Sequence, residues 1–82
     1  MKLPVIRHLQ RNNSVQQMEN CIEVLESFSD YSRIGEEELD IVGELITNLC
    51  GAVEVHKMIE EGMPERDAAN NFAQKVLGSI DR

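Results

Sequence analysis

One segment, "EEELDIVGELITNLCGAVEVHKMIEEG" at residues 36–62, constrains the fold of this chain more than any other. Its pattern predicts one helix of about 26 residues, which would extend about 39 Å at 1.5 Å per residue. A compact chain of 82 residues has a diameter of only about 30 Å. Apolar positions also cover about 220° of the helix circumference, against about 100° for an ordinary surface helix. Either the helix therefore bends at Gly43 or Gly51, or another chain covers part of it.

Three further segments show helical periodicity, at residues 1–13, 14–28 and 64–80. In the first, Pro4 suits the first turn of a helix, although an extended conformation for residues 3–11 remains an alternative. Ser14 and Gln17 predict a capping box for the second, and Gly62 predicts a left-handed end to the long helix. We expect a single all-α domain over residues 1–82. It is a small bundle of three main helices plus a short N-terminal helix, and the last two helices form an antiparallel hairpin.

The long segment carries an apolar seam whose spacing alternates between three and four residues, as in a coiled coil. The residues of this seam are Leu39, Val42, Ile46, Leu49, Val53 and His56. A second stripe holds Ile41, Leu45, Ala52 and Ile59. Because two neighbouring helices cannot enclose both stripes, we expect the seam to be the interface of a homodimer.

Charge is strongly acidic and unevenly spread. The formal net charge is −7, which disfavours binding to nucleic acid because phosphate backbones are repelled. Residues 12–61 hold twelve acids against Arg33 and Lys57, whereas residues 1–11 contain Lys2, Arg7 and Arg11 and no acid. An acidic face with a basic end beside it is one interpretation, and a surface for a basic partner is the other.

No apolar run approaches the roughly 18 residues of a membrane span, and the four residues "LPVI" are too few for the core of a signal peptide. We therefore expect a cytoplasmic protein that does not enter the membrane. In that compartment the two cysteines are expected to be thiols.

The stretch "CGAVEVHKMIEEGMP" at residues 50–64 raises the question of a reactive or metal site. Cys50 and His56 point about 120° apart on a helix and are separated by about 9 Å along its axis, so they cannot share a ligand. His56 lies within the apolar arc and is expected to be a core or interface histidine with a hydrogen bond. Cys21 and Cys50 are expected to be buried structural thiols, with a redox role as the alternative. We predict no metal, no cofactor and no catalytic residue.

The segments "MKLPVI", "LDIVGELITNLCGAVEVHKMIEEG" and "FAQKVLGSIDR" together resemble a family of small bacterial proteins of unknown function and of about this length. The resemblance covers nearly the whole chain and is loosest between Arg11 and Glu36. It implies an all-helical fold and no known activity, cofactor or ligand.

These observations predict a non-enzymatic, acidic helical interaction module that forms a homodimer. The alternative is a small thiol-redox accessory protein that uses Cys21 or Cys50. The sequence names neither the physiological partner nor the pathway.

Overall fold

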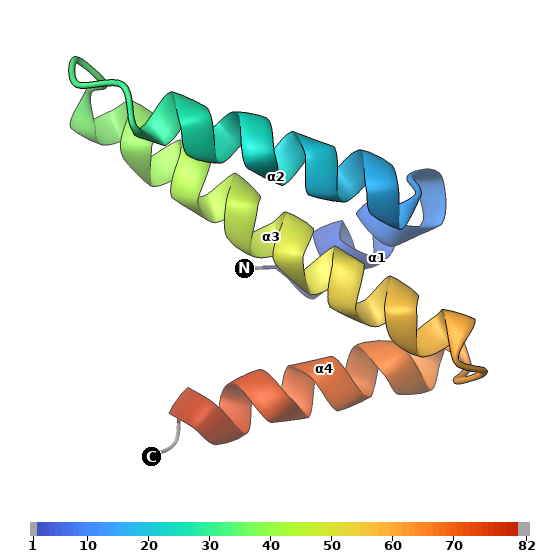
Figure 1. Ribbon diagram of the computed structural model, residues 1–82. Helices are drawn as coiled ribbons and strands as arrows, with labels where there is room; N and C mark the ends of the chain where they lie inside the picture. Colours follow the sequence, from blue (N-terminus) through green and yellow to red (C-terminus); the bar gives the residue numbers. More distant parts are fainter. Residues whose placement is uncertain (1, 81–82) are drawn as a thin grey trace.

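The computed structural model describes the backbone of residues 2–80 and the side chains of residues 2–76. It contains four helices and, within those residues, no strand (Figure 1). The helices are α1 (Leu3–Asn12), α2 (Val15–Ser29), α3 (Glu36–Glu60) and α4 (Glu65–Ile80). The predicted all-α fold, with a short N-terminal helix and a long central one, is confirmed.

The helix ends follow from local hydrogen bonds. Before α2, the backbone N–H of Gln17 donates to Ser14 Oγ at 3.1 Å, and the N–H of Ser14 donates to Gln17 Oε1 at 2.8 Å, which completes the predicted capping box. Before α3, Glu38 Oε1 accepts from the N–H of Gly35 at 3.1 Å. After α3, Gly62 adopts a φ of 108°, a left-handed conformation that only glycine adopts without strain. The predicted glycine end of the long helix is therefore confirmed.

Residues 3–11 are helical, which decides against the extended alternative. Pro4 lies in the first turn of α1, where its missing N–H removes no helical hydrogen bond. Ile6 and Gln10 are buried on the inner side of α1, while His8 is exposed on the outer side. Such a two-sided helix is stabilised by packing, because ten residues are too few to hold a helix in water by themselves.

The long helix α3 runs unbroken through Gly43 and Gly51 (Figure 1). The molecule is accordingly long and flat, with extents of 43 × 32 × 16 Å and a radius of gyration of 13.7 Å, against about 12 Å for a compact chain of this length. Helix α2 runs alongside α3 and antiparallel to it. Helices α1 and α4 pack on the C-terminal half of α3, and α4 diverges from α3 after the turn at residues 61–64.

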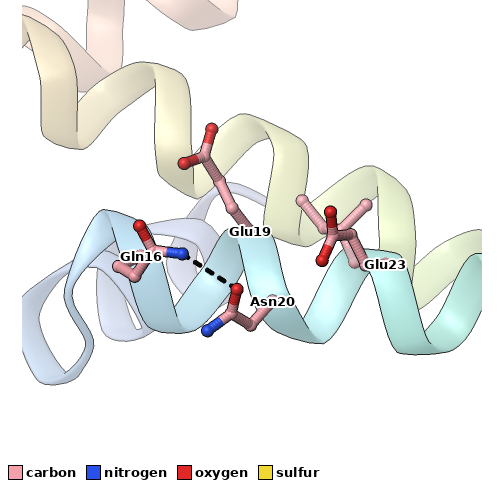
Figure 2. Close-up of a pocket in the computed structure, with 5 residues that line it drawn as sticks. Gln16, Glu19, Asn20 and Glu23 are labelled. Atoms are coloured by element: carbon pink, nitrogen blue, oxygen red, sulfur yellow. Dashed lines mark hydrogen bonds between the residues drawn. The ribbon is translucent and has the colours of Figure 1, made fainter.

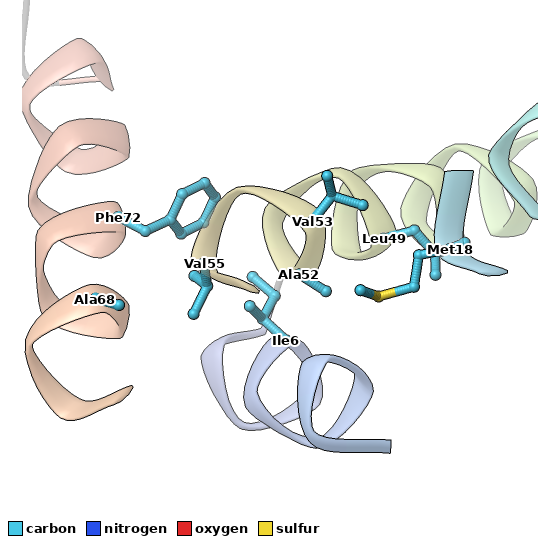
Figure 3. Close-up of a cluster of buried hydrophobic side chains, with 8 residues drawn as sticks. All are labelled: Ile6, Met18, Leu49, Ala52, Val53, Val55, Ala68 and Phe72. Atoms are coloured by element: carbon cyan, nitrogen blue, oxygen red, sulfur yellow. The ribbon is translucent and has the colours of Figure 1, made fainter. Parts of the chain in front are cut away.

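The core lies where α1, α2 and α4 meet the C-terminal half of α3 (Figure 3). Its buried members are Ile6, Met18, Leu49, Ala52, Val53, Val55, Ala68 and Phe72. Gly51 allows this approach, because a Cβ there would lie 2.8 Å from Ile6 Cδ1 and 3.0 Å from Phe72 Cζ. At Gly43 a Cβ would meet nothing within 4 Å. Two glycines of one helix thus have opposite surroundings.

Candidate interaction surface

The Cys50–His56 stretch does not assemble a reactive site. His56 is half-buried, and its Nδ1–H donates to the backbone carbonyl of Gln10 at 3.1 Å. Its Nε2 lies 3.9 Å from Glu60 Oε1. The side chains described contain no group of three His, Cys, Asp or Glu residues that could hold a metal ion. The predicted hydrogen bond of His56 is confirmed, and it joins α3 to the last turns of α1.

Both cysteines are exposed, so the expectation that they are buried is wrong. Cys21 lies within the apolar stripe of α2. The neighbouring helices cover only the side of that stripe that holds Met18, Ile22 and Leu25, so Cys21 is left exposed. Cys50 lies on the flank of α3 that faces Glu26 of α2. Partial burial, and then the carboxylate of Glu26, raise the pKa of the Cys50 thiol. A raised pKa means less thiolate at neutral pH, which is unfavourable for redox chemistry at this position.

The residues predicted to form a dimer seam are mostly covered within the chain itself. Val42, Leu49 and Val53 are all buried to below a tenth exposure, and Leu49 lies beside Met18 of α2 (Figure 3). Ile46 and His56 are half-buried, whereas Leu39 is 44% exposed. Much of this seam therefore lies between α2 and α3. This is compatible with its pattern, because two packed antiparallel helices also contact each other through residues spaced three and four apart.

Instead, most of the large apolar side chains that the described residues leave in solvent lie at the other end of the α2–α3 pair, with Val5 of α1 as the exception. We call this surface the apolar tip, and define it as Val24, Phe28, Tyr31, Leu39, Ile41 and Leu45. Ile41 is 59% exposed and Val24 is 68% exposed. In the sequence, the second apolar stripe singled out Ile41 and Leu45 as apolar positions outside the seam. No sequence pattern distinguished Val24, Phe28 and Tyr31 from core residues. An exposed cluster of this kind is typical of an interaction surface.

Acidic residues surround the apolar tip. Residues 19–47 hold nine carboxylates against the single guanidinium of Arg33, which gives this segment a net charge of −8. The rest of the sequence holds seven Lys and Arg residues against six acids. Glu37 and Glu44 lie one turn before and one turn after Ile41 on α3, and both are exposed. The charge of the sequence is therefore strongly polarised, since residues 19–47 are acidic and the remainder is nearly neutral.

A separate ionic cluster fastens α1 to the start of α4. Glu65 Oε1 accepts from Gln10 Nε2 at 2.9 Å and from Arg11 Nε at 2.6 Å, and Arg7 Nε lies 3.7 Å away. The hydrogen bond from Arg11 is the largest of the effects that lower the pKa of Glu65. The same carboxylate raises the pKa of Arg11. Arg7 Nε is buried without a hydrogen-bond partner, so the cluster holds more donors than its one carboxylate satisfies.

The open hollows on the described part of the surface include two that are larger than the hollow beside Leu49. One, of about 330 Å³, is lined by Leu3, Pro4, Arg7 and Arg11 on α1. The other, of about 370 Å³, lies along α2 and is lined by Gln16, Glu19, Asn20, Ile22 and Glu23 (Figure 2). In the second, Gln16 donates to Asn20 Oδ1 at 2.9 Å, so these two amides satisfy each other in part. Neither hollow brings together the groups that a defined reaction would require.

Comparison with known proteins assigns the chain to a family. The model of a family of unknown function (DUF6952) matches residues 1–81, and the chain belongs to that family. No curated protein and no solved structure matches the chain. The expected membership in a family without known activity is confirmed.

No helix in the described part of the chain combines the length and the apolar character needed to cross a membrane.

Proposed function

We propose that this protein is a non-enzymatic interaction module that pairs with a second copy of itself through the apolar tip. The observation that carries the proposal is the exposure of large apolar side chains on two adjacent helices, above all Ile41 and Leu45 on α3 and Val24 on α2. Burying apolar surface contributes about 25 cal/mol per Å², so covering this cluster favours association.

The shape of the molecule supports a partner chain. With a thickness of 16 Å between Cα atoms, the described residues form no third layer over the first half of α3. Helix α2 covers Val42 there, but Leu39, Ile41 and Leu45 remain exposed. A second copy with two-fold symmetry is the commonest way in which a chain completes such a surface.

The test is the mass of the protein in solution. Sedimentation equilibrium or light scattering across micromolar concentrations should give a mass near twice the 9.3 kDa of one chain. Leu45→Glu should raise the dimer Kd by at least about tenfold, because an unpaired carboxylate buried in a contact costs several kcal/mol. Thr47→Glu is the matched control, since it adds the same charge to the other flank of the same helix. A folded monomer at all concentrations would refute the homodimer.

Leu45 is a better position for this test than the residues of the seam. Leu49 is 8% exposed and belongs to the core, so a charge there would unfold the chain whether or not it dimerises. Leu45 is 46% exposed, and circular dichroism of Leu45→Glu should therefore retain the helical spectrum of the wild type.

One observation favours the thiol-redox alternative, namely the exposure of Cys21 and Cys50. Against it stands the raised pKa of Cys50, next to Glu26. Redox-active cysteines are typically placed beside cationic groups, which lower the pKa of the thiol. The interaction module therefore remains the better-supported function.

A further inference from the structure

Helix α1 occupies one end of the side of the α2–α3 pair on which Ile41, Leu45, Val24 and Phe28 of the apolar tip lie. The backbone N–H of Lys2 donates to Asn48 Oδ1 at 3.0 Å, and the carbonyl of Gln10 accepts from His56 Nδ1 at 3.1 Å. Leu9 of α1 lines a small hollow with Cys21 of α2 and Leu49 of α3. Helix α1 thus lies along the junction of α2 with the second half of α3, and it begins beside Asn48.

Four residues of the apolar tip continue that same side beyond the start of α1, namely Ile41 and Leu45 on α3 and Val24 and Phe28 on α2. Leu39 instead lies on the face of α3 that holds Lys57. On α3, Ile41, Leu45, Asn48 and Ala52 follow one another at spacings of four, three and four residues, so they share one face of the helix. On α2, Cys21, Val24 and Phe28 share a face in the same way. The opposite side of the pair is different, because there Glu19 meets Lys57 at 3.8 Å and Glu26 faces Cys50. One side of the α2–α3 pair is therefore covered by α1 at one end and bare at the other.

Helix α1 and the acidic segment carry charges of opposite sign, although Glu65 of α4 already contacts Arg7 and Arg11 at 3.7 and 2.6 Å. Helix α1 and the residue before it contain Lys2, Arg7 and Arg11 and no acid, whereas residues 19–47 carry a net charge of −8. Two tips placed against each other would oppose their carboxylates, and like charges brought together at an interface cost several kcal/mol. An α1 placed over a tip would instead bring cations to the rim formed by Glu37 and Glu44.

We propose that in the dimer the α1 of each copy covers the apolar tip of the other. This inference rests on the proposed homodimer and adds its geometry. The two copies run antiparallel with their α1 sides facing, so that the two-fold axis passes near the beginning of α1. The end of each copy that carries α1 then meets the uncovered end of the other copy. The contact is the same in both directions, as a closed two-fold interface requires. Val5, which is 38% exposed on the outer side of α1, packs on Ile41 and Leu45 of the partner copy.

Disulfide cross-linking between two variants tests this arrangement. In a background with Cys21→Ser and Cys50→Ser, a Val5→Cys chain is mixed with a Leu45→Cys chain and oxidised. Disulfides require Cβ atoms within about 4.5 Å, so the bond reports close approach. The mixture should cross-link about tenfold faster than either chain alone, because docking raises the local concentration of the thiols. Thr47→Cys, on the other flank of α3, is the matched control and should not cross-link to Val5→Cys.

The outcomes separate this inference from the proposed function. Rapid cross-linking of Leu45→Cys with itself would show tips in contact and overturn the arrangement. A dimer by mass without a cross-link between Val5→Cys and Leu45→Cys would also overturn it, while leaving the homodimer intact. A monomer by mass would overturn both.

A charge reversal provides a second, independent readout. Glu44 is exposed and makes no hydrogen bond or ion pair within the part of the chain described, so Glu44→Lys leaves the monomer fold unchanged. If α1 covers the tip, this variant removes an attraction and should raise the dimer Kd by about two- to fivefold, as expected for an exposed ion pair. If two tips meet, it relieves a repulsion and lowers the Kd. An unchanged or lowered Kd would overturn the proposal.

Discussion

The two halves of α3 differ in how many helices pack against them. In the first half, residues 36–47, Val42 is the one buried residue, whereas the second half, residues 48–60, has six. Helix α2 lies along both halves, but α1 and α4 pack on the second half (Figure 1). Both halves carry apolar residues at helical spacing. An apolar pattern in the sequence therefore indicates which residues a helix is able to bury. The number of neighbouring helices decides which of those residues are buried.

Two leucines one turn apart give the largest expected contrast. Leu49 is 8% exposed and Leu45 is 46% exposed. Leu49→Ala should lower the free energy of unfolding by about 2–5 kcal/mol, because it leaves a cavity in the core. Leu45→Ala should change it by less than about 1 kcal/mol. Urea denaturation at a concentration where the monomer predominates measures both, and equal losses would contradict the division of α3 into two unlike halves.

The two glycines of α3 should respond to the same substitution with opposite signs. Gly43→Ala should raise the free energy of unfolding by up to about 1 kcal/mol, since alanine favours helix and the site has free space. Gly51→Ala should lower it by roughly 1–2 kcal/mol, because its Cβ would overlap Ile6 and the ring of Phe72. Thermal denaturation of the two variants side by side checks the prediction. A stabilising Gly51→Ala would show that α1 and α4 do not approach α3 as closely as described.

The smallest effect concerns the ionic cluster that fastens α1 and α4 to each other. The pKa of Glu65 is lowered in the folded chain by Arg11, so its contribution to stability is complete above the unfolded value of about 4.3. That contribution is lost as the pH falls through the lower folded value. Wild type should therefore lose more stability between neutral pH and about pH 3 than Glu65→Gln does. Denaturant titrations at a series of pH values measure this difference.

Glu37→Gln is the control for the pH experiment. Its carboxylate is exposed on the first half of α3 and has no hydrogen bond or ion pair in the described residues. Its removal should leave the acid dependence of stability close to that of wild type. If Glu65→Gln and Glu37→Gln behave alike, the Glu65 cluster does not fasten the second half of the molecule.

Local chemistry allowed most of the fold to be predicted from the sequence. Ser14 with Gln17 determined the start of α2, and Gly62 determined the end of α3, because a capping box and a left-handed glycine involve residues only a few positions apart. The hydrogen bond of the half-buried His56 was likewise predictable, since a polar ring within an apolar arc needs a partner. The sequence did not indicate that the partner is the carbonyl of Gln10.

Exposure could not be predicted in the same way. Cys21 lies within an apolar stripe and was expected to be buried, yet it is exposed. Val42 and Leu45 have equivalent apolar character in the sequence, but Val42 is 5% exposed and Leu45 is 46% exposed. The difference depends on whether a helix lies opposite each side chain, and that helix comes from a distant part of the chain.

The sequence alone therefore determined the last three helices, the start of α2, the end of α3, the acidic charge of residues 19–47 and the excess of apolar surface on α3, while the helical state of residues 3–11 was left to the structure. The tertiary structure decided that α3 does not bend at Gly43 or Gly51, that α1 and α4 both pack on its second half, and that the apolar tip is left bare. The physical reason is the separation in the sequence of the residues that interact. Helix formation and capping depend on hydrogen bonds between residues about four positions apart, whereas burial depends on packing between helices that are separated by tens of residues in the sequence.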